Sequence, residues 1–108
     1  MDRIKIYQVK NISELIKDDV FDSKFSLGYK ELPKETFDKH YECSGIFNLN
    51  QFKKDNEETL EILENIFMEM NINRNLYDIN YSLSINDVIQ INDKKYQVMS
   101  MGYNRLNY

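Results

Sequence analysis

The chain has 108 residues, of which 42% are hydrophobic and 30% are charged, and its formal net charge at pH 7 is -4. This length suits one domain with a single core, and apolar residues are too abundant for a disordered chain. Because 18 acidic residues outnumber 14 basic ones, general binding to a phosphate backbone is disfavoured. We therefore expect one globular domain over residues 1–108.

Cysteine usage and hydropathy indicate the cellular setting. Cys43 is the only cysteine, which excludes a disulfide within the chain and favours a reducing compartment. No stretch approaches the ~20 apolar residues of a membrane span, and the first residues lack the apolar run of a signal peptide. The abundance of Asn, Lys, Ile and Tyr is typical of AT-rich bacterial or phage genes. These features predict a cytoplasmic protein of a bacterial host cell, without membrane contact.

The first predicted element is a strand at residues 4–9, where β-branched and aromatic side chains alternate with other residues. Asn11 follows at once, and Glu14 stands three residues later, which is the spacing of a helix capping box. Apolar residues then recur at helical spacing. A short helix of about two turns should therefore begin here and end near Asp18.

The next part of the chain predicts mixed structure. Residues 22–32 contain Gly28 among scattered apolar positions and are expected to form a loop or a short strand. Pro33 suits the first position of a helical turn that follows. Residues 41–47 are a second strand candidate, in which Gly45 marks a bulge.

The clearest element is a helix at about residues 56–70. Asp55 and Glu58 supply a capping pair at its start. Its predicted apolar face consists of Leu60, Leu63, Ile66, Phe67 and Met70, and its predicted acidic face includes Glu57, Glu61 and Glu64. Since a coiled coil needs more heptads, the apolar face should pack on a sheet of the same chain.

The last third predicts a β-hairpin. Residues 71–81 are polar and Asn-rich, as expected of a connecting loop, and Ser84 is placed to cap a turn that reaches Asp87. Two strand-like runs joined by a polar turn occupy residues 88–101. The chain therefore predicts an α+β fold: a small, mostly antiparallel sheet, the 56–70 helix packed on it, and a C-terminal β-hairpin.

Several short motifs resemble the YodL-like domain family. They are SLSINDVI at 82–89, YQV at 96–98, Gly-Tyr at 102–103, IYQV at 6–9 and the helix LEILENIF at 60–67. The resemblance runs from end to end, with a weak middle. It implies a single YodL-like domain, of a kind frequent on plasmids, conjugative elements and phages of Gram-positive bacteria, and it implies no catalytic residue.

No catalytic or metal-binding constellation stands out in the sequence. His40 and Cys43 are three residues apart, which puts them on opposite faces of a strand, and no second pair completes a tetrahedral metal site. Cys43 is therefore expected to be a small core residue. For Asp87, a structural role in a capping turn is favoured over a general base. We expect no cofactor, no metal and no enzymatic activity.

Surface side chains that suit a protein partner are the remaining candidates. Glu57, Glu61 and Glu64 could engage a basic groove on a partner, although a solvated face is the simpler alternative. The other candidate contact residues are Tyr77, Asp78, Tyr81, Tyr103 and Arg105. Tyrosine also fills cores in a domain without Trp, so both roles stay open.

These observations favour a non-enzymatic protein-binding module from a phage or another mobile element. Its sharper form is an anti-CRISPR-like inhibitor that binds a host protein such as a CRISPR effector or another defence nuclease. The alternative is a plasmid or conjugative-element accessory protein associated with nucleic acid, which predicts a basic patch around Lys94, Lys95 and Arg105. An enzyme would depend on His40 and Cys43. The protein-binding hypothesis expects surface for recognition and no cleft for a reaction.

Overall fold

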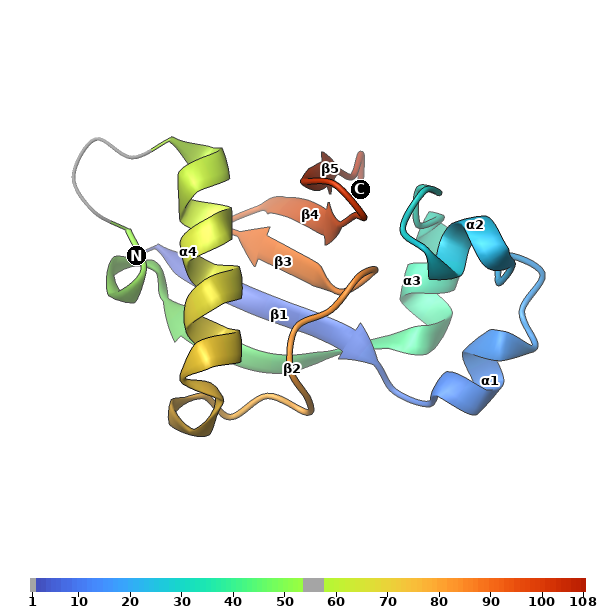
Figure 1. Cartoon of the computed structure of the whole chain (residues 1–108), viewed down its shortest axis with the longest axis horizontal. Helices are drawn as coiled ribbons and strands as arrows, with labels where there is room; N and C mark the ends of the chain where they lie inside the picture. The colour runs from blue at the N-terminus through green and yellow to red at the C-terminus, as the bar shows by residue number, and fades with distance from the viewer. Residues whose placement is uncertain (1, 54–57) are drawn as a thin grey trace.

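The computed structural model describes residues 2–53 and 58–108, and its described part contains one five-stranded antiparallel sheet (Figure 1). The strands are β1 (Arg3–Val9), β2 (Tyr41–Asn48), β3 (Val88–Ile91), β4 (Lys94–Val98) and β5 (Tyr103–Arg105). Their order across the sheet is β2-β1-β3-β4-β5, and each neighbouring pair is antiparallel. The predicted α+β fold class is confirmed.

β1 lies inside the sheet and pairs with both β2 and β3. The side chains of Ile4 and Ile6 are fully buried, as alternation in a strand requires for the face that carries the core. Opposite β1, the register of β2 shifts between Gly45 and Cys43, so that Ser44 is the extra residue of a bulge. The predicted bulge at this glycine is confirmed.

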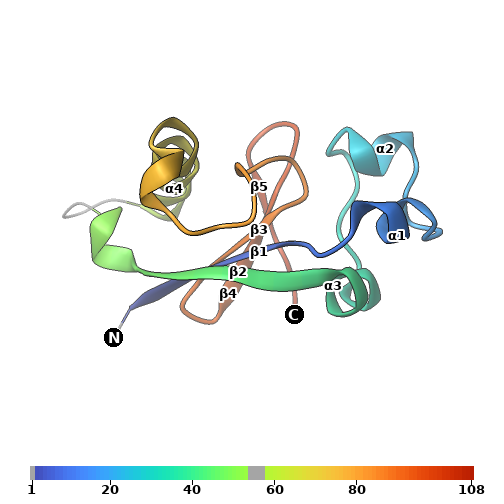
Figure 2. The same cartoon turned by 90° about the horizontal axis from the view of Figure 1, so that it is seen from below.

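Helix α4 (Thr59–Ile72) lies across one face of the sheet (Figures 1 and 2). Its buried residues are Ile62, Leu63, Ile66 and Met70, which pack with the even-numbered side chains of β1. The prediction was wrong for Leu60, whose side chain is 54% exposed. At 3.6 residues per turn, Leu60 points about 100° away from the centre of the buried stripe, and Ile62 takes its place.

The bounds of this helix also differ from the prediction. It continues to Ile72, two residues past the expected end, because the polar residues after Met70 still make helical hydrogen bonds, such as the one from Asn73 N–H to the Glu69 carbonyl (2.9 Å). A 3-10 turn, η2 (Arg74–Leu76), follows within the segment that was expected to be a loop. The predicted start and the residues Asp55 and Glu57 lie at or within positions 54–57, outside the described residues.

Three short helices gather at the other end of the sheet (Figure 2). They are α1 (Ile12–Ile16), α2 (Ser23–Ser26) and α3 (Lys34–His40). Asn11 caps α1 as predicted, since its side chain accepts from the N–H groups of Ser13 and Glu14. The expected loop or strand at 22–32 is instead helical at α2, because the Asp22 carboxylate accepts from Phe25 N–H at 2.8 Å.

The helix α3 packs on the face of the sheet opposite α4. Tyr7, which alternates with the buried Ile6, meets Phe37 of α3 edge to face at a ring distance of 5.0 Å. Pro33 immediately precedes this helix, in the extended conformation of a cap residue. A second apolar cluster forms here, separate from the one beneath α4, and it consists of Leu15, Val20, Phe25, Leu32, Phe37, Tyr41, Val88 and Leu106.

The C-terminal hairpin is present but shorter than the predicted 88–101. β3 and β4 are joined at Asn92 and Asp93, and β4 ends at Val98. A tight turn then brings Met99 N–H to the carbonyl of Gly102 (3.0 Å) and leads into β5, which the sequence did not predict. No helix in the described part of the chain is long and apolar enough to cross a membrane.

Candidate functional site

The chain that enters β3 is held on the sheet by a buried polar network. Gln8 of β1 is fully buried, and its side-chain N–H group donates to the carbonyl of Tyr81 (2.8 Å) and to Oδ2 of Asp87 (3.1 Å). The side-chain oxygen of Gln8 accepts from the hydroxyl of Ser44 and from Asn80 N–H. This network joins β1, the bulge of β2 and the strand entry into one unit.

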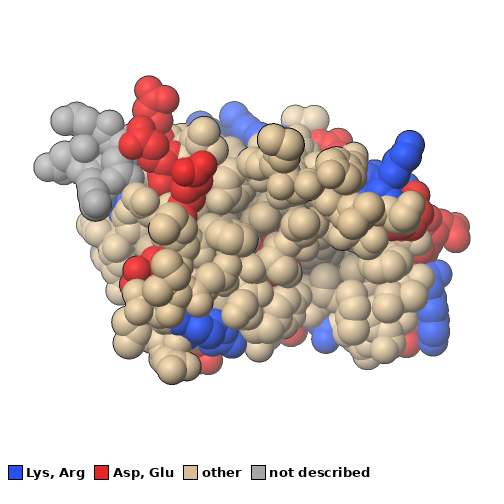
Figure 3. All heavy atoms as spheres, viewed as in Figure 1, with Lys and Arg blue, Asp and Glu red and all other residues tan. Residues whose placement is uncertain are grey.

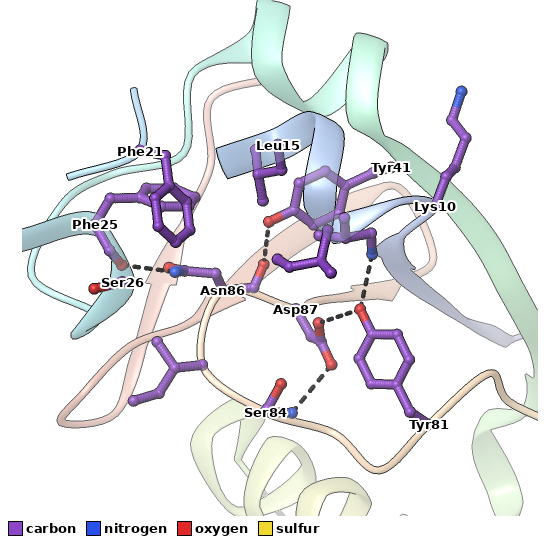
Figure 4. A pocket seen from close by; sticks show the side chains of 13 residues that line it. Lys10, Leu15, Phe21, Phe25, Ser26, Tyr41, Tyr81, Ser84, Asn86 and Asp87 are labelled. Atoms are coloured by element: carbon purple, nitrogen blue, oxygen red, sulfur yellow. Dashed lines mark hydrogen bonds between the residues drawn. The ribbon is translucent and has the colours of Figure 1, made fainter. Parts of the chain in front are cut away.

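Asp87 is the carboxylate at the centre of this unit. Its Oδ2 also accepts from Ser84 N–H (3.0 Å), whereas its Oδ1 has the long 3.5 Å contact with the hydroxyl of Tyr81 (Figure 4). The side chain is 2% exposed, and this burial raises the pKa of Asp87 to about 7. The predicted turn from Ser84 to Asp87 is present. The capping acceptor, however, is the carboxylate of Asp87, which accepts from Ser84 N–H, whereas the sequence predicted that Ser84 would cap the turn.

Next to Asp87 lies a hollow of about 500 Å³, which we call the hollow throughout. It opens between the α1 and α2 end and the strand entry, and the surface is recessed there in Figure 3. Its lining includes apolar residues, among them Leu15, Phe21, Phe25 and Ile85, together with Tyr81 and Asp87 (Figure 4). The sequence predicted surface for recognition and no cleft for a reaction; this hollow was not foreseen, and neither His40 nor Cys43 lines it.

Asn86 fixes one wall of the hollow. Its backbone has a φ of 73°, a left-handed conformation that Asn tolerates better than most residues. Its side-chain N–H donates to the carbonyl of Phe25 (2.7 Å), and its side-chain oxygen accepts from the fully buried Gln97 (2.9 Å). The hydroxyl of Tyr41 donates to its carbonyl (2.7 Å). These bonds tie α2 to the hairpin.

A second concave surface, which we call the groove, lies between the turn after α2 and the turn after β4. Its lining includes Tyr29, Met99, Met101 and Tyr103, and its volume is about 500 Å³. The two turns touch at Gly28, whose carbonyl accepts from Ser100 N–H (3.0 Å). Gly28 has a φ of +81°, and an added Cβ would stand 2.6 Å from that nitrogen, so only glycine permits this approach.

The structure separates the predicted tyrosine contacts. Tyr81 lines the hollow and Tyr103 lines the groove. Tyr77 instead packs edge to face on Phe47 at 5.6 Å and tilts against Phe52, so it belongs to the core beneath α4. The sequence could not assign these roles, because Tyr77 and Tyr81 lie in a connecting segment and Tyr103 in an unpredicted strand, so that tertiary contacts alone distinguish them.

The charged candidates are spread over the surface. Glu61 and Glu64 are exposed on α4, and Figure 3 shows acidic side chains gathered over the first half of that helix. Burial and then the negative charge of Glu64 raise the pKa of Tyr103, so this glutamate stands near the groove. Asp78 and Arg105 are exposed elsewhere, and Glu57 lies outside the described residues.

His40 and Cys43 form no joint site. Cys43 is exposed on the edge strand β2, so the expectation that it is a core residue was wrong. The bulge and the lack of any outer neighbour leave the thiol facing solvent. His40 is 6% exposed, and its Nε2 lies 2.9 Å from Oδ2 of Asp18. Over residues 2–53 and 58–108, no cluster of His, Cys, Asp and Glu could hold a metal ion.

The basic residues of the nucleic-acid alternative do not share one face. Lys94 and Arg105 belong to the α4 side of the sheet, since they alternate in step with Tyr96, whereas Lys95 points to the opposite side. The ammonium of Lys95 lies 5.8 Å from the centre of the Phe37 ring and donates to the carbonyl of Tyr108. The three cations are therefore divided between two faces.

Comparison with known proteins adds no relative. No family model matches the chain, and neither the curated proteins nor the solved structures contain a significant match. The resemblance to YodL-like domains stays a prediction.

Proposed function

We propose that the chain is a non-enzymatic protein-binding module that contacts its partner through the groove. The observation that carries this proposal is the exposure of large apolar side chains there: Met101 is 89% exposed and Tyr29 is 66% exposed. Because the backbone beneath these side chains is already fixed, a partner does not have to order that backbone on binding. Gly28 and Ser100 fix it here through their backbone hydrogen bond.

The charges near the groove favour a particular kind of partner surface. Glu31 lines the groove and accepts from the side chain of Asn104 (3.0 Å), and Glu64 stands near Tyr103. The chain also has a formal net charge of -4. A partner that inserts an apolar side chain between basic residues would match both features. A nucleic-acid-binding enzyme has a basic surface of this kind.

The proposal in its sharper form is an inhibitor of a host defence nuclease, such as a CRISPR effector, encoded by a phage or another mobile element. Its support is the resemblance to YodL-like domains and the acidic first half of α4, which suits a basic nucleic-acid channel. This form rests on analogy as well as on geometry.

The general proposal is tested by affinity capture from a lysate of the cells that naturally carry the gene. Met101→Asp and Tyr29→Asp place a charge in the groove, whereas Leu76→Asp places one at a site that is 73% exposed in η2. We expect the wild type and L76D to capture the same stoichiometric partner, and M101D and Y29D to lose it. Capture of no partner, or equal capture by all four proteins, would refute the groove as a binding surface.

The sharper form has its own test. The purified protein is added to guide-loaded CRISPR nucleases, and target cleavage is followed with wild type, M101D and L76D. We expect wild type and L76D to slow cleavage by at least one nuclease and M101D to leave it unchanged. Uninhibited cleavage throughout would remove the nuclease hypothesis, while affinity capture would still decide the general one.

A further inference from the structure

The hollow has the size and walls of a small-molecule site. Its volume of about 500 Å³ lies within the roughly 300–1,000 Å³ common for ligand pockets. Leu15 and Phe25, both almost fully buried, form its floor, and Ile12 and Ile85 stand at its exposed rim. The apolar part of a small ligand can therefore be buried in the hollow without displacing core side chains.

A buried carboxylate without a cationic neighbour lines this hollow. Asp87 accepts hydrogen bonds from neutral donors of Gln8, Ser84 and Tyr81, and none of the ion pairs formed by the described residues includes it. The ammonium of Lys10 points away from Asp87 (Figure 4). Buried carboxylates are ordinarily paired with a cation, and this one has none among residues 2–53 and 58–108.

Asp87 also has unused capacity to accept hydrogen bonds. Its Oδ1 has the long 3.5 Å contact with the hydroxyl of Tyr81, and the Ser84 side chain also interacts with the carboxylate, whereas each carboxylate oxygen can accept two hydrogen bonds. The Tyr81 hydroxyl itself accepts from Val9 N–H at 2.9 Å, so it is held in place at the mouth of the hollow. An incoming N–H donor could therefore add a further hydrogen bond to the carboxylate of Asp87.

We propose that the hollow binds a small organic amine, with its ammonium group against Asp87 and its apolar body between Phe25 and Ile85. This site is distinct from the groove, and the proposal does not depend on a protein partner. A cation is favoured over a neutral or anionic ligand because of the charges in the lining. Asp87 is its acidic side chain, and Lys10 is its basic side chain, whose ammonium group points away from the hollow. Burial raises the pKa values of Tyr41 and Tyr81, so both hydroxyls are neutral at pH 8.

Three probes with the same ring system test the charge preference. Indole, tryptamine and indole-3-acetate are neutral, cationic and anionic at pH 8, where Asp87 is ionised because its pKa is about 7. Binding is measured by NMR titration of the purified full chain. We expect tryptamine to bind at least about tenfold more tightly than indole, and indole-3-acetate to bind more weakly than indole. Equal affinities for the three probes, or no binding of any, would refute the proposal.

Variants assign the preference to Asp87. Asp87→Asn keeps an acceptor oxygen but removes the charge, and Asp78→Asn removes a charge from an exposed position of the same connecting segment. We expect D87N to lose the tryptamine preference while its affinity for indole is retained, and D78N to behave as wild type. An unchanged preference in D87N would overturn the assignment.

A second variant keeps the test decisive if D87N folds poorly. Ser84→Arg changes an exposed side chain of the lining but preserves the backbone N–H that holds Asp87. Its guanidinium would occupy the place of the ammonium. We expect S84R to remain folded and to abolish tryptamine binding, whereas undiminished binding in S84R would contradict the proposed position of the amine.

Discussion

Replacing Asp87 by Asn should stabilise the protein, and by more at pH 8 than at pH 5. The amide has the shape of the protonated carboxyl group. Its oxygen can occupy the place of Oδ2 and accept from Gln8 and Ser84 N–H, and its NH₂ group can donate to the hydroxyl of Tyr81. The variant therefore keeps the bonds to Gln8 and Ser84, reverses the direction of the long bond to Tyr81, and removes the charge.

The magnitude follows from the pKa of Asp87, which burial raises from 3.8 to about 7. Between these values the native state binds a proton that the unfolded state has released, so the free energy of unfolding of the wild type falls as the pH rises, and the loss is complete above the native pKa. From pH 5 to pH 8, at ~1.36 kcal/mol per tenfold change, the difference between D87N and wild type should grow by about 3 kcal/mol.

Urea unfolding of both proteins at pH 5, 6, 7 and 8 measures this difference. Asp18 and Asp22 have pKa values lowered chiefly by backbone N–H groups, so their stabilisation is lost only as the pH falls below about 4. Any other titration shared by the two proteins cancels in the difference. A difference that stays constant from pH 5 to pH 8 would show that Asp87 is ionised throughout and that the buried site does not penalise its charge.

Two further pairs of substitutions test the packing. Ile66→Ala, on the buried face of α4, should lower the free energy of unfolding by about 2–5 kcal/mol. Met68→Ala replaces a residue that is 57% exposed and should change the free energy of unfolding by less than ~0.5 kcal/mol. Equal effects of the two substitutions in urea unfolding would show that α4 is not packed on the sheet. Gly28→Ala and Gly102→Ala both impose a left-handed backbone on a residue with a Cβ, but only G28A meets neighbouring atoms, with Ser100 N at 2.6 Å. In thermal unfolding G28A should therefore be destabilised by at least ~1 kcal/mol more than G102A, and similar losses would contradict the close approach of the two turns.

The sequence correctly predicted those helices and strands that a local spacing pattern identifies. The capping oxygen of Asn11, the alternation of β1 and the period of α4 are of this kind, and the structure confirms all three elements. Leu60 shows the limit of this approach, since both Leu60 and Ile62 can be assigned to the apolar face from the sequence alone. Packing on the sheet decides between them, and it buries Ile62 and leaves Leu60 exposed.

The candidate sites could not be predicted because they depend on contacts between distant segments. Asp87 carries a capping signature with Ser84, but the burial that raises its pKa comes from the folded structure around it, and its hydrogen-bond partner Gln8, which lowers the pKa, stands 79 residues earlier. Likewise, Gly28 ends α2 in the left-handed conformation common at helix C-termini, but its contact with Ser100 appears only when the two distant turns are brought together. Exposure of Cys43 depends on β2 being an edge strand, which topology decides.

The helix α2 is common to both candidate sites. Phe25 lines the hollow and accepts a hydrogen bond from Asn86, while Gly28, two residues past the helix end, lines the groove and accepts from Ser100. A shift of this four-residue helix would therefore move a wall of each site at once. Coupling between two binding sites is reciprocal, so whatever factor tryptamine applies to partner affinity, the partner must apply to tryptamine affinity.

This coupling is measurable once a partner has been captured. Partner affinity is determined by titration at pH 8, without tryptamine and with tryptamine at a concentration that saturates wild type but not D87N, for both proteins. We expect tryptamine to change the affinity of the wild type by several-fold, within the ~5–150-fold typical of such coupling, and to leave D87N unchanged. Asp87 does not line the groove. If tryptamine changes partner affinity in wild type but not in D87N, the effect is therefore transmitted through α2, which both sites share. An unchanged affinity in wild type would mean that the hydrogen bonds of Asn86 and Gly28 hold α2 as a rigid spacer, and that the hollow and the groove act independently.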